Sequence, residues 1–318
     1  MNTRDIFKKA GGMKTIRQMA QSGSLGTAVG EFLLLGRSRP ALELLRLSTR
    51  LKNRQKLEKR YLPELENYYR SYDTGLPHVS SDKVWICWFQ GMENAPELVQ
   101  RCYRSVKENL KDRDVVVITS ENLSEYVQFP DYILDKWKRG IITHTHMTDL
   151  LRLELLIRYG GLWLDATVFC SSPEAEIPAH YFEDDLFFYQ CLKPGRDGHC
   201  CYLSSWLLSA KTNDRVLMTV RHLCYEYWKK NDKMIDYFLL HIFFSMVLDH
   251  DPEAWKRVTP RDNAAPHILL LRLFDPYDER MWEHIRSLTP FHKLTYKFAA
   301  EDAAKKGTYY DVLFGGNH

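Results

Sequence analysis

The sequence has few of the features that mark membrane-spanning or disulfide-stabilised proteins. Its 318 residues include 7 cysteines, an odd number without a Cys-x-x-Cys pair, which argues against a disulfide framework and a zinc knuckle. The longest apolar run, residues 237–248, is shorter than the ~20 residues of a spanning helix. Residues 1–14 lack the apolar stretch of a signal peptide. We therefore expect a folded cytoplasmic protein.

Positive charge is concentrated at the start of the chain. Residues 1–62 hold 14 Lys and Arg but 4 Asp and Glu, so the overall net charge of +3 combines a basic end with an acidic body. A basic end predicts an anionic partner, either anionic lipid or nucleic acid. Leucines at helical spacing predict helices here, and Gly23, Gly26 and Gly30 favour several short helices over one.

The organisation of the chain changes after this basic segment. Residues 63–82 are polar and predict a linker. Residues 84–89, 95–110 and 114–119 then show a buried strand, an amphipathic helix and a second strand, a spacing typical of a parallel α/β layer. Residues 299–318 are expected to form a polar tail. The other expected elements are strands at 162–169, 186–190 and 206–210, and helices at 121–127, 131–138, 148–159, 214–230 and 235–249.

The most informative segment is residues 143–169. Asp149 and Arg152 are three residues apart on a predicted helix, so they share one face and can bind a polar ligand or each other. A glycine pair ends this helix, and Asp165 lies near the end of the apolar strand that follows. Ligands of open α/β sheets bind beyond the strand ends, and an unpartnered buried carboxylate is costly. Asp165 is therefore a candidate ligand for a divalent metal or a ribose hydroxyl.

The order of these motifs resembles that of a known group of enzymes. Residues 148–152 (TDLLR), a helix and residues 159–168 (YGGLWLDATV) are similar to the Ser-Asp-x-x-Arg, Gly-Gly and Asp-x-Asp pattern of sugar transferases with the GT-A fold. The resemblance is closest to glycosyltransferase family 32 and its relatives among the clostridial glucosylating toxins.

More narrowly, the chain resembles the bacterial capsular polysaccharide synthesis proteins. Residues 84–103, 237–241 and 292–297 support this narrower match. The resemblance spans residues 83–298 and implies a GT-A-like, Rossmann-type mixed α/β sheet flanked by helices. The basic helical extension at residues 1–62 precedes it.

The resemblance assigns roles to residues of this sequence. It implies that Asp149 and Arg152 hold the donor sugar and that Asp165 is the first Asp of the Asp-x-Asp motif. Thr167 stands where relatives have the second Asp, the main protein ligand of Mn²⁺ or Mg²⁺. A neutral hydroxyl is a much weaker partner for such a cation. Either Asp165 and another group hold the ion, or the protein neutralises the donor diphosphate with its own cations.

Further residues join the expected site through the same resemblance. The expected donor-binding set is Trp85, Gln90, Gly160, Gly161, Thr167 and Lys293, with Trp85 stacking on a uracil-like base and the glycines forming a tight turn. The expected metal ligands are Asp165, His292 and His241.

The implied function is a glycosyltransferase of capsular or surface polysaccharide synthesis that retains anomeric configuration. It would move a sugar from a nucleotide-sugar donor, preferably a UDP-sugar, to a glycan or lipid-linked acceptor. We expect residues 1–62 to contact the anionic inner surface of the cell membrane.

Three alternatives remain open from the sequence. His144, His146 and Asp149 resemble part of a zinc-hydrolase motif, although the Asp falls one position late. The basic N-terminus would also suit nucleic acid, but the body is acidic and no nucleic-acid motif is present. A catalytically inactive relative is the third alternative, and Thr167 is its strongest support.

Overall fold

The computed structural model describes residues 25–36, 38–190, 201 and 203–315. A five-stranded sheet has the strand order β2-β1-β3-β6-β5. The strands are β1 Lys83–Cys87, β2 Asp114–Ile118, β3 Gly161–Leu164, β5 Leu186–Gln190 and β6 Leu203–Ala210. β1 pairs in parallel with β2 and β3, whereas β6 is antiparallel to β3 and β5. The expected mixed α/β sheet is therefore confirmed.

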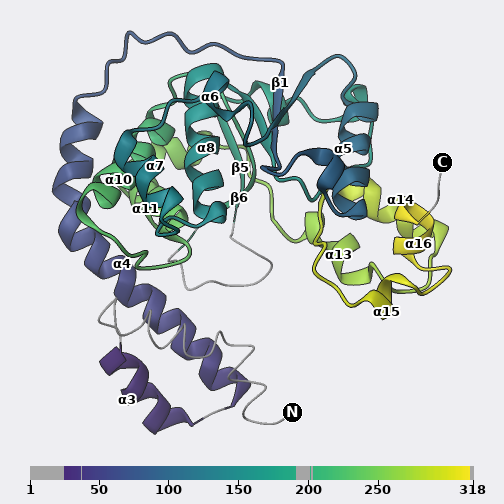
Figure 1. Cartoon of the computed structure of the whole chain (residues 1–318), viewed down its shortest axis with the longest axis horizontal. Helices are drawn as coiled ribbons and strands as arrows, with labels where there is room; N and C mark the ends of the chain where they lie inside the picture. Colours follow the sequence, from purple (N-terminus) through teal and green to yellow (C-terminus); the bar gives the residue numbers. More distant parts are fainter. Residues whose placement is uncertain (1–24, 37, 191–200, 202, 316–318) are drawn as a thin grey trace.

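Helices lie on both sides of this sheet (Figure 1). On one side are α8 His144–Tyr159, α10 Arg215–Lys230 and α11 Leu239–His250. α8 and α11 contact the sheet, and α10 packs against both of these helices. On the other side is α5 Glu97–Asn109, the crossover between β1 and β2. α8 begins where the Thr143 hydroxyl accepts a hydrogen bond from the His146 N–H (3.2 Å), a normal N-cap. Most of α8 is buried because α10 covers the face that the sheet does not.

The chain leaves the central sheet immediately after β3. The sequence predicts one strand over 162–169, but β3 ends at Leu164 and a separate strand, β4 Val168–Cys170, follows. β4 pairs with β7 Phe291–Lys293 in a second, two-stranded antiparallel sheet. The intervening turn, in which the Val168 N–H donates to the Asp165 carbonyl (3.0 Å), places Asp165 at the edge where the parallel strands end.

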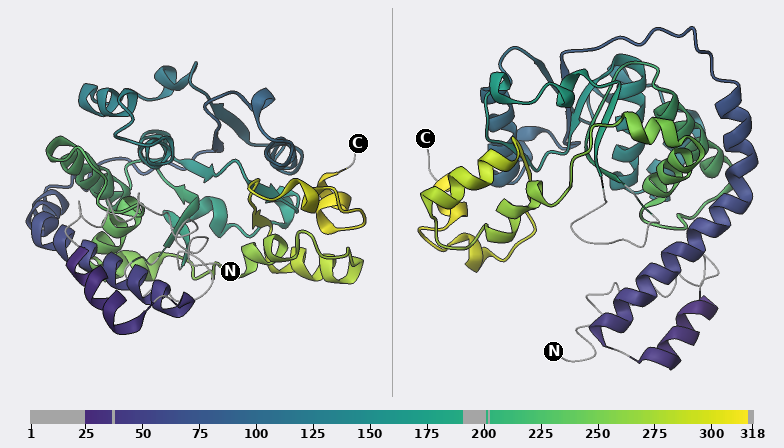
Figure 2. Two further views of the ribbon diagram at one scale, coloured as in Figure 1. Left: turned by 60° about the horizontal axis from the view of Figure 1, so that its bottom comes forward. Right: turned by 180° about the vertical axis from the view of Figure 1, so that it is seen from behind.

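The described part of the N-terminal segment contains one short helix and one long helix, where the sequence favours several short ones. α3 Leu25–Leu35 is followed by α4 Arg39–Arg70, which continues through Pro63. The helix therefore ends eight residues beyond the expected boundary at 62, and only residues 71–82 form an extended connection. Buried residues at four-residue spacing hold α4 against α10 and α11, and their packing outweighs the helix-breaking effect of proline; they are Leu57, Tyr61, Leu65 and Tyr69. Beyond this contact, α3 and the start of α4 project from the body (Figure 2).

Residues 309–314 form a packed helix, which corrects the expected polar tail at 299–318; residues 316–318 lie outside the described part of the chain. α16 Tyr309–Phe314 buries Tyr309, Tyr310 and Phe314. These side chains join an apolar cluster with α13 Ile268–Arg272, α14 Glu279–Leu288 and one face of α5. The prediction of a polar tail was wrong because its apolar residues are few and closely spaced, while the residues they pack against lie far away in the sequence.

The remaining helices are short. They are α6 Leu123–Tyr126, α7 Asp131–Lys138, α9 His180–Glu183, α12 Pro252–Arg257 and α15 Ala300–Ala303, with 3-10 turns at Met92–Asn94, Glu174–Glu176 and Ala265–His267. Among the described helices, none combines the length and the apolar composition that crossing a bilayer requires.

Candidate active site

The structure brings Asp149, Arg152 and Asp165 into one network at the carboxyl end of β3. Arg152 lies between the two carboxylates, with Nη1 at 3.2 Å from Asp149 Oδ1 and Nη2 at 3.3 Å from Asp165 Oδ1. α8 supplies Asp149 and Arg152 from one face, as their spacing predicts. The turn after β3 supplies Asp165. Parallel strands end at this edge, where ligands of α/β sheets bind.

Arg152 is buried and has a partner on nearly every side. Its guanidinium donates to the Ser205 carbonyl on β6 (2.9 Å) and to the Ser205 hydroxyl. It also lies over the Trp163 ring, 5.1 Å from the centroid, which is a cation–π geometry. A buried charge needs such partners to offset its lost hydration. The orientation of Arg152 is therefore fixed before any ligand binds.

The two carboxylates differ in their access to solvent. The side chain of Asp149 is 8% exposed and that of Asp165 is 29% exposed, so Asp165 is the acid that a ligand can reach directly. Burial would raise the pKa of both groups, but nearby charges and hydrogen bonds outweigh it and hold each pKa below its usual value. The Arg152 cation and a hydrogen bond with His146 act on Asp149, and the Lys293 and Arg152 cations act on Asp165. Both acids are therefore ionised at neutral pH.

Lys293 occupies the position between Asp165 and Thr167. Its Nζ donates to Asp165 Oδ2 (2.8 Å) and to Thr167 Oγ1 (2.7 Å). The pairing of Val168 with Lys293 across β4 and β7 places the ammonium there. The Trp163 indole N–H completes the shell of Asp165 (3.1 Å to Oδ1). Thr167, which stands at the second position of the motif in place of a carboxylate, therefore has the Lys293 ammonium beside it.

His146 is a site residue whose role the sequence reasoning missed. Its Nε2 accepts from the Trp228 indole N–H (2.9 Å), and its Nδ1 lies 3.2 Å from Asp149 Oδ2. Because an indole N–H can only donate, Nε2 is the acceptor and Nδ1 carries the hydrogen. His146 therefore donates to Asp149. The signal in the sequence was its position three residues before Asp149 on the same helix.

The pair of histidines expected for zinc does not converge. His144 is exposed and its Nδ1 accepts from the Trp137 indole N–H (3.2 Å), whereas His146 is buried against Trp228 and Asp149. In an α-helix, residues two positions apart point to different sides, so His144 and His146 cannot bind the same metal ion. Within the described ranges, no group of three or more His, Cys, Asp and Glu side chains is arranged to hold a metal ion.

The two histidines expected as metal ligands lie away from Asp165. His292 is fully buried behind β7, on the face opposite Lys293, where its Nε2 meets the Ser171 hydroxyl (2.9 Å). Burial lowers its pKa to about 3. His241 is nearer, since its Nε2 lies 3.0 Å from the Ser205 hydroxyl that Arg152 also contacts. Its link to Asp165 runs through Ser205 and Arg152, so the structure does not support either histidine as a ligand beside Asp165.

Three expected donor-binding residues lie at the opposite edge of the sheet. Trp85 is fully buried, and its indole N–H donates to the Gly160 carbonyl (2.9 Å). Gly160 and Gly161 form the tight turn that the sequence predicts, with φ of 68° and 98°, but this turn precedes β3 while the charged network follows it. These residues shape the sheet, and Trp85 is a core residue rather than a base-stacking one.

The loop after β1 lies at the ligand-binding edge. Gln90, another expected donor-binding residue, is exposed there, and its carbonyl accepts from the Asn94 amide (2.7 Å). Trp88 precedes it, half-buried, with its ring edge against Tyr296 (centroids 5.7 Å apart). Trp88 is therefore the tryptophan of this segment that reaches the edge.

This arrangement places the protein in a broad class and comparison places it in a family. In proteins with an open α/β sheet, ligands bind beyond the carboxyl ends of the strands, and the fixed charges at this position suit a polar or charged ligand. The family model for the capsular polysaccharide synthesis protein matches residues 43–313, so the chain belongs to that family. The match extends beyond the expected 83–298 at both ends and includes most of α4 and most of α16. It does not test the assignment to glycosyltransferase family 32.

Curated relatives match a part of the chain. It is 34% identical over 116 residues to the O-glycosyltransferase braB of Annulohypoxylon truncatum, a stretch covering 33% of this chain and 28% of that protein. It is 31% identical over 100 residues to the glycosyltransferase afumC of Aspergillus fumigatus, covering 28% and 26%. The chain therefore spans just over a quarter of the length of these relatives. Among solved structures, the PaToxG glycosyltransferase aligns over 82% of this chain and 95% of that one, with 12% identity and a TM-score of 0.39.

Proposed function

We propose that the protein is a glycosyltransferase that moves a sugar from a nucleotide-sugar donor, preferably a UDP-sugar, to a glycan or lipid-linked acceptor in polysaccharide synthesis, with retention of anomeric configuration. The observation that carries this proposal is the chain of contacts Asp149–Arg152–Asp165–Lys293 at the ligand-binding edge of the sheet. Family membership and the two related glycosyltransferases support it.

Each member of the network has a role that suits sugar transfer. The donor leaves as a diphosphate, so negative charge grows on its oxygens in the transition state, and Lys293 and Arg152 are the cations placed to stabilise it. Ionised Asp165 can accept hydrogen bonds from sugar or ribose hydroxyls and so orient the anomeric carbon. Asp149 keeps Arg152 in position.

The residues around Asp165 do not suit the divalent metal that the fold family implies. A divalent ion needs several oxygen ligands, preferably carboxylates, whereas Asp165 Oδ1 and Oδ2 accept from Arg152, Trp163 and Lys293. The second position of the motif is Thr167, and its hydroxyl accepts from the same ammonium. Our proposal is therefore that Lys293 neutralises the diphosphate and that transfer does not need Mn²⁺ or Mg²⁺.

Thermal unfolding against nucleotides tests the proposed donor. A ligand at 100 times its dissociation constant adds about 2.7 kcal/mol to the folded state, which raises the melting temperature measurably. We expect UDP and UDP-sugars to raise it, with and without Mn²⁺. No shift with any nucleoside diphosphate or nucleotide sugar would contradict the proposed donor class. NMR of the product's anomeric proton tests retention.

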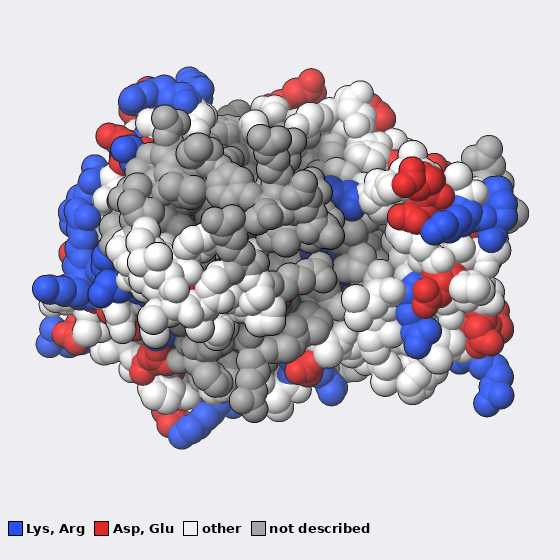
Figure 3. Space-filling model, turned by 90° about the horizontal axis from the view of Figure 1, so that it is seen from below, with Lys and Arg blue, Asp and Glu red and all other residues white. Residues whose placement is uncertain are grey.

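The projecting helices support a contact with an anionic membrane surface. On α3, the side chains of Leu33 and Leu34 are 78% and 83% exposed. Lys and Arg side chains gather along one edge of the molecule (Figure 3), and α4 contributes exposed residues such as Lys52 and Lys59. An apolar end beside basic residues suits the interface of an anionic bilayer. This is our proposed role for the extension.

Vesicle binding tests this membrane contact. We expect the full chain to sediment with vesicles containing phosphatidylglycerol and to dissociate as salt rises. The variant Leu33→Ser/Leu34→Ser should bind more weakly, whereas Leu271→Ser, which alters an equally exposed leucine (76%) on α13, should bind normally. Equal binding by all three proteins would contradict the contact.

A further inference from the structure

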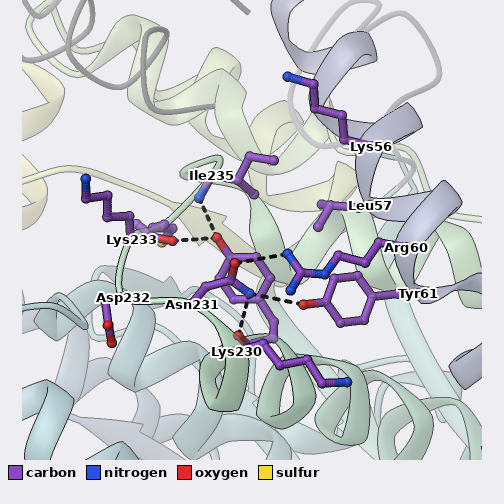
Figure 4. A pocket seen from close by; sticks show the side chains of 11 residues that line it. Lys56, Leu57, Arg60, Tyr61, Lys230, Asn231, Asp232, Lys233 and Ile235 are labelled. Atoms are coloured by element: carbon purple, nitrogen blue, oxygen red, sulfur yellow. Dashed lines mark hydrogen bonds between the residues drawn. The ribbon is translucent and has the colours of Figure 1, made fainter. Parts of the chain in front are cut away.

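A basic cavity lies between α4 and the loop that follows α10 (Figure 4). Its volume is about 390 Å³. Four cationic side chains line it, two from α4 and two from the end of α10 and its loop: Lys56, Arg60, Lys230 and Lys233. Nothing in the charged network around Asp165 uses these residues.

The lining of this cavity holds more cationic than acidic side chains. Asp232 is the acidic residue among those that line it, and its carboxylate pairs with Lys136 on α7 (2.9 Å). In Figure 4 the Asp232 side chain points away from the centre of the cavity. Lys230 pairs with Glu226 (3.1 Å), but Glu226 also serves Lys229. The cavity therefore keeps a positive potential, which favours an anion.

Neutral groups complete a set of hydrogen-bond donors. The Asn231 amide donates to the Tyr61 hydroxyl (3.1 Å) and to the Tyr227 carbonyl (2.7 Å), and its oxygen accepts from Arg60 (3.3 Å). Since the Tyr61 oxygen accepts this bond, its hydroxyl hydrogen can still be donated. The Arg60 guanidinium has further N–H groups in a planar fork, which matches the oxygens of a phosphate.

The loop that borders this cavity also reaches the candidate active site. Asn231–Ile235 line the cavity, and Tyr237 follows two residues later. Burial raises the pKa of Tyr237, and the nearby charges of Asp149 and Asp165 raise it further. A molecule with one end in the cavity and the other at Asp165 would therefore pass along one short loop.

We propose that this cavity binds a phosphate or diphosphate group; in its application to the acceptor, this inference rests on the proposed function. The source of the group is either the diphosphate of a lipid-linked acceptor or the headgroup of a membrane phospholipid. Both sources present the anionic oxygens of a phosphate group to Arg60 and the lysines.

A charge-matched pair of variants tests the site. Arg60→Gln/Lys230→Gln removes two cavity cations, and Lys107→Gln/Lys256→Gln removes two exposed lysines that do not line the cavity and lie outside α3 and α4. Every protein also carries Lys293→Gln, so that the ligand-binding edge of the sheet does not contribute. Calorimetry with geranyl diphosphate and sedimentation with phosphatidylglycerol vesicles supply the two sources of phosphate. Melting temperatures confirm that each variant folds.

The cavity variant should bind at least about tenfold more weakly than its control, since each lost charge-assisted hydrogen bond is a strong one. A loss with geranyl diphosphate assigns the site to an acceptor diphosphate, and a loss confined to vesicles assigns it to a headgroup. Equal binding by both variants, or an equal loss in both, overturns the proposal. With Lys293 intact, both variants should bind UDP equally well. If the wild type does not bind UDP, the proposed donor is contradicted, but the result for the cavity still stands.

Discussion

The two ends of β3 are fixed by different kinds of interaction. At its start, Gly160 and Gly161 have positive φ, and a Cβ on Gly161 would lie 2.3 Å from the Lys83 carbonyl oxygen. At its end, Asp165 is held by Arg152 and Lys293. Close backbone packing decides the first position and charge decides the second. Changes at the start should therefore affect folding, and changes at the end should affect chemistry.

The largest expected effect is on transfer, at the charged end of β3. Asp165→Asn keeps the shape of the side chain but removes the charge that balances Lys293, and we expect the turnover rate to fall by about 10²–10³. The melting temperature should change little. Asp185→Asn, which alters an exposed carboxylate paired with Lys211 (2.6 Å), is the control in the same transfer assay. Near-normal turnover in Asp165→Asn would contradict the role of this acid.

The next effect is on folding, at the other end of the strand. Gly161→Ala combines an unfavourable φ with a backbone clash, and we expect a loss of about 3 kcal/mol or more of unfolding free energy. Gly140→Ala is the matched control, because Gly140 also has positive φ (70°) but no atom within 4 Å of the added Cβ. Its expected loss is about 1 kcal/mol. Urea unfolding measures both, and similar losses would contradict the packing argument.

A smaller effect on transfer is expected at His146, which contacts the charged network through Asp149. His146→Phe removes the hydrogen bond to Asp149, and we expect turnover to fall about tenfold with KM nearly unchanged, as befits a positioning residue. His146→Asn keeps an N–H donor and should restore part of the loss. His144→Gln, on the exposed side of the same helix turn, should behave like the wild type. A fall in His144→Gln as large as that in His146→Phe would contradict the assignment.

The smallest expected effect concerns acid stability away from the network. Burial lowers the pKa of His292 to about 3 from 6.5, so below pH 6.5 the unfolded chain binds a proton that the folded chain does not. The free energy of unfolding should therefore decrease as the pH is lowered below 6.5, by up to about 1.4 kcal/mol per pH unit from this residue. Urea unfolding at pH 7 and pH 5 should show a shallower fall in His292→Gln than in the wild type. Identical slopes would contradict this.

Much of the central sheet could be predicted from local patterns. β1, α5 and β2 lie within two residues of their expected ranges at each end, because buried strands and an amphipathic helix have clear periodicities. The break between β3 and β4 was not predictable in this way, since residues 162–169 are apolar in both strands. It depends on β7, more than a hundred residues later.

The candidate site shows the same limit. Asp149, Arg152 and Asp165 were predicted from their spacing and from the resemblance, and the structure brings them together. Lys293 was expected at the donor, and it lies beside Asp165. The prediction for Trp85 was wrong because a strand pattern does not show which end of the strand a ligand binds. The prediction for His292 was wrong because only strand pairing decides which face of a three-residue strand a side chain occupies.

In our proposal Lys293, on β7 beside the end of β3, neutralises the donor diphosphate in place of a metal ion. Calorimetric titration of UDP into the wild type and into Lys293→Gln, each with EDTA and with Mn²⁺, tests it most directly. We expect the wild type to bind UDP with the same affinity in EDTA as in Mn²⁺, and Lys293→Gln to bind much more weakly in both. Binding of the wild type that appears only when Mn²⁺ is added would contradict it.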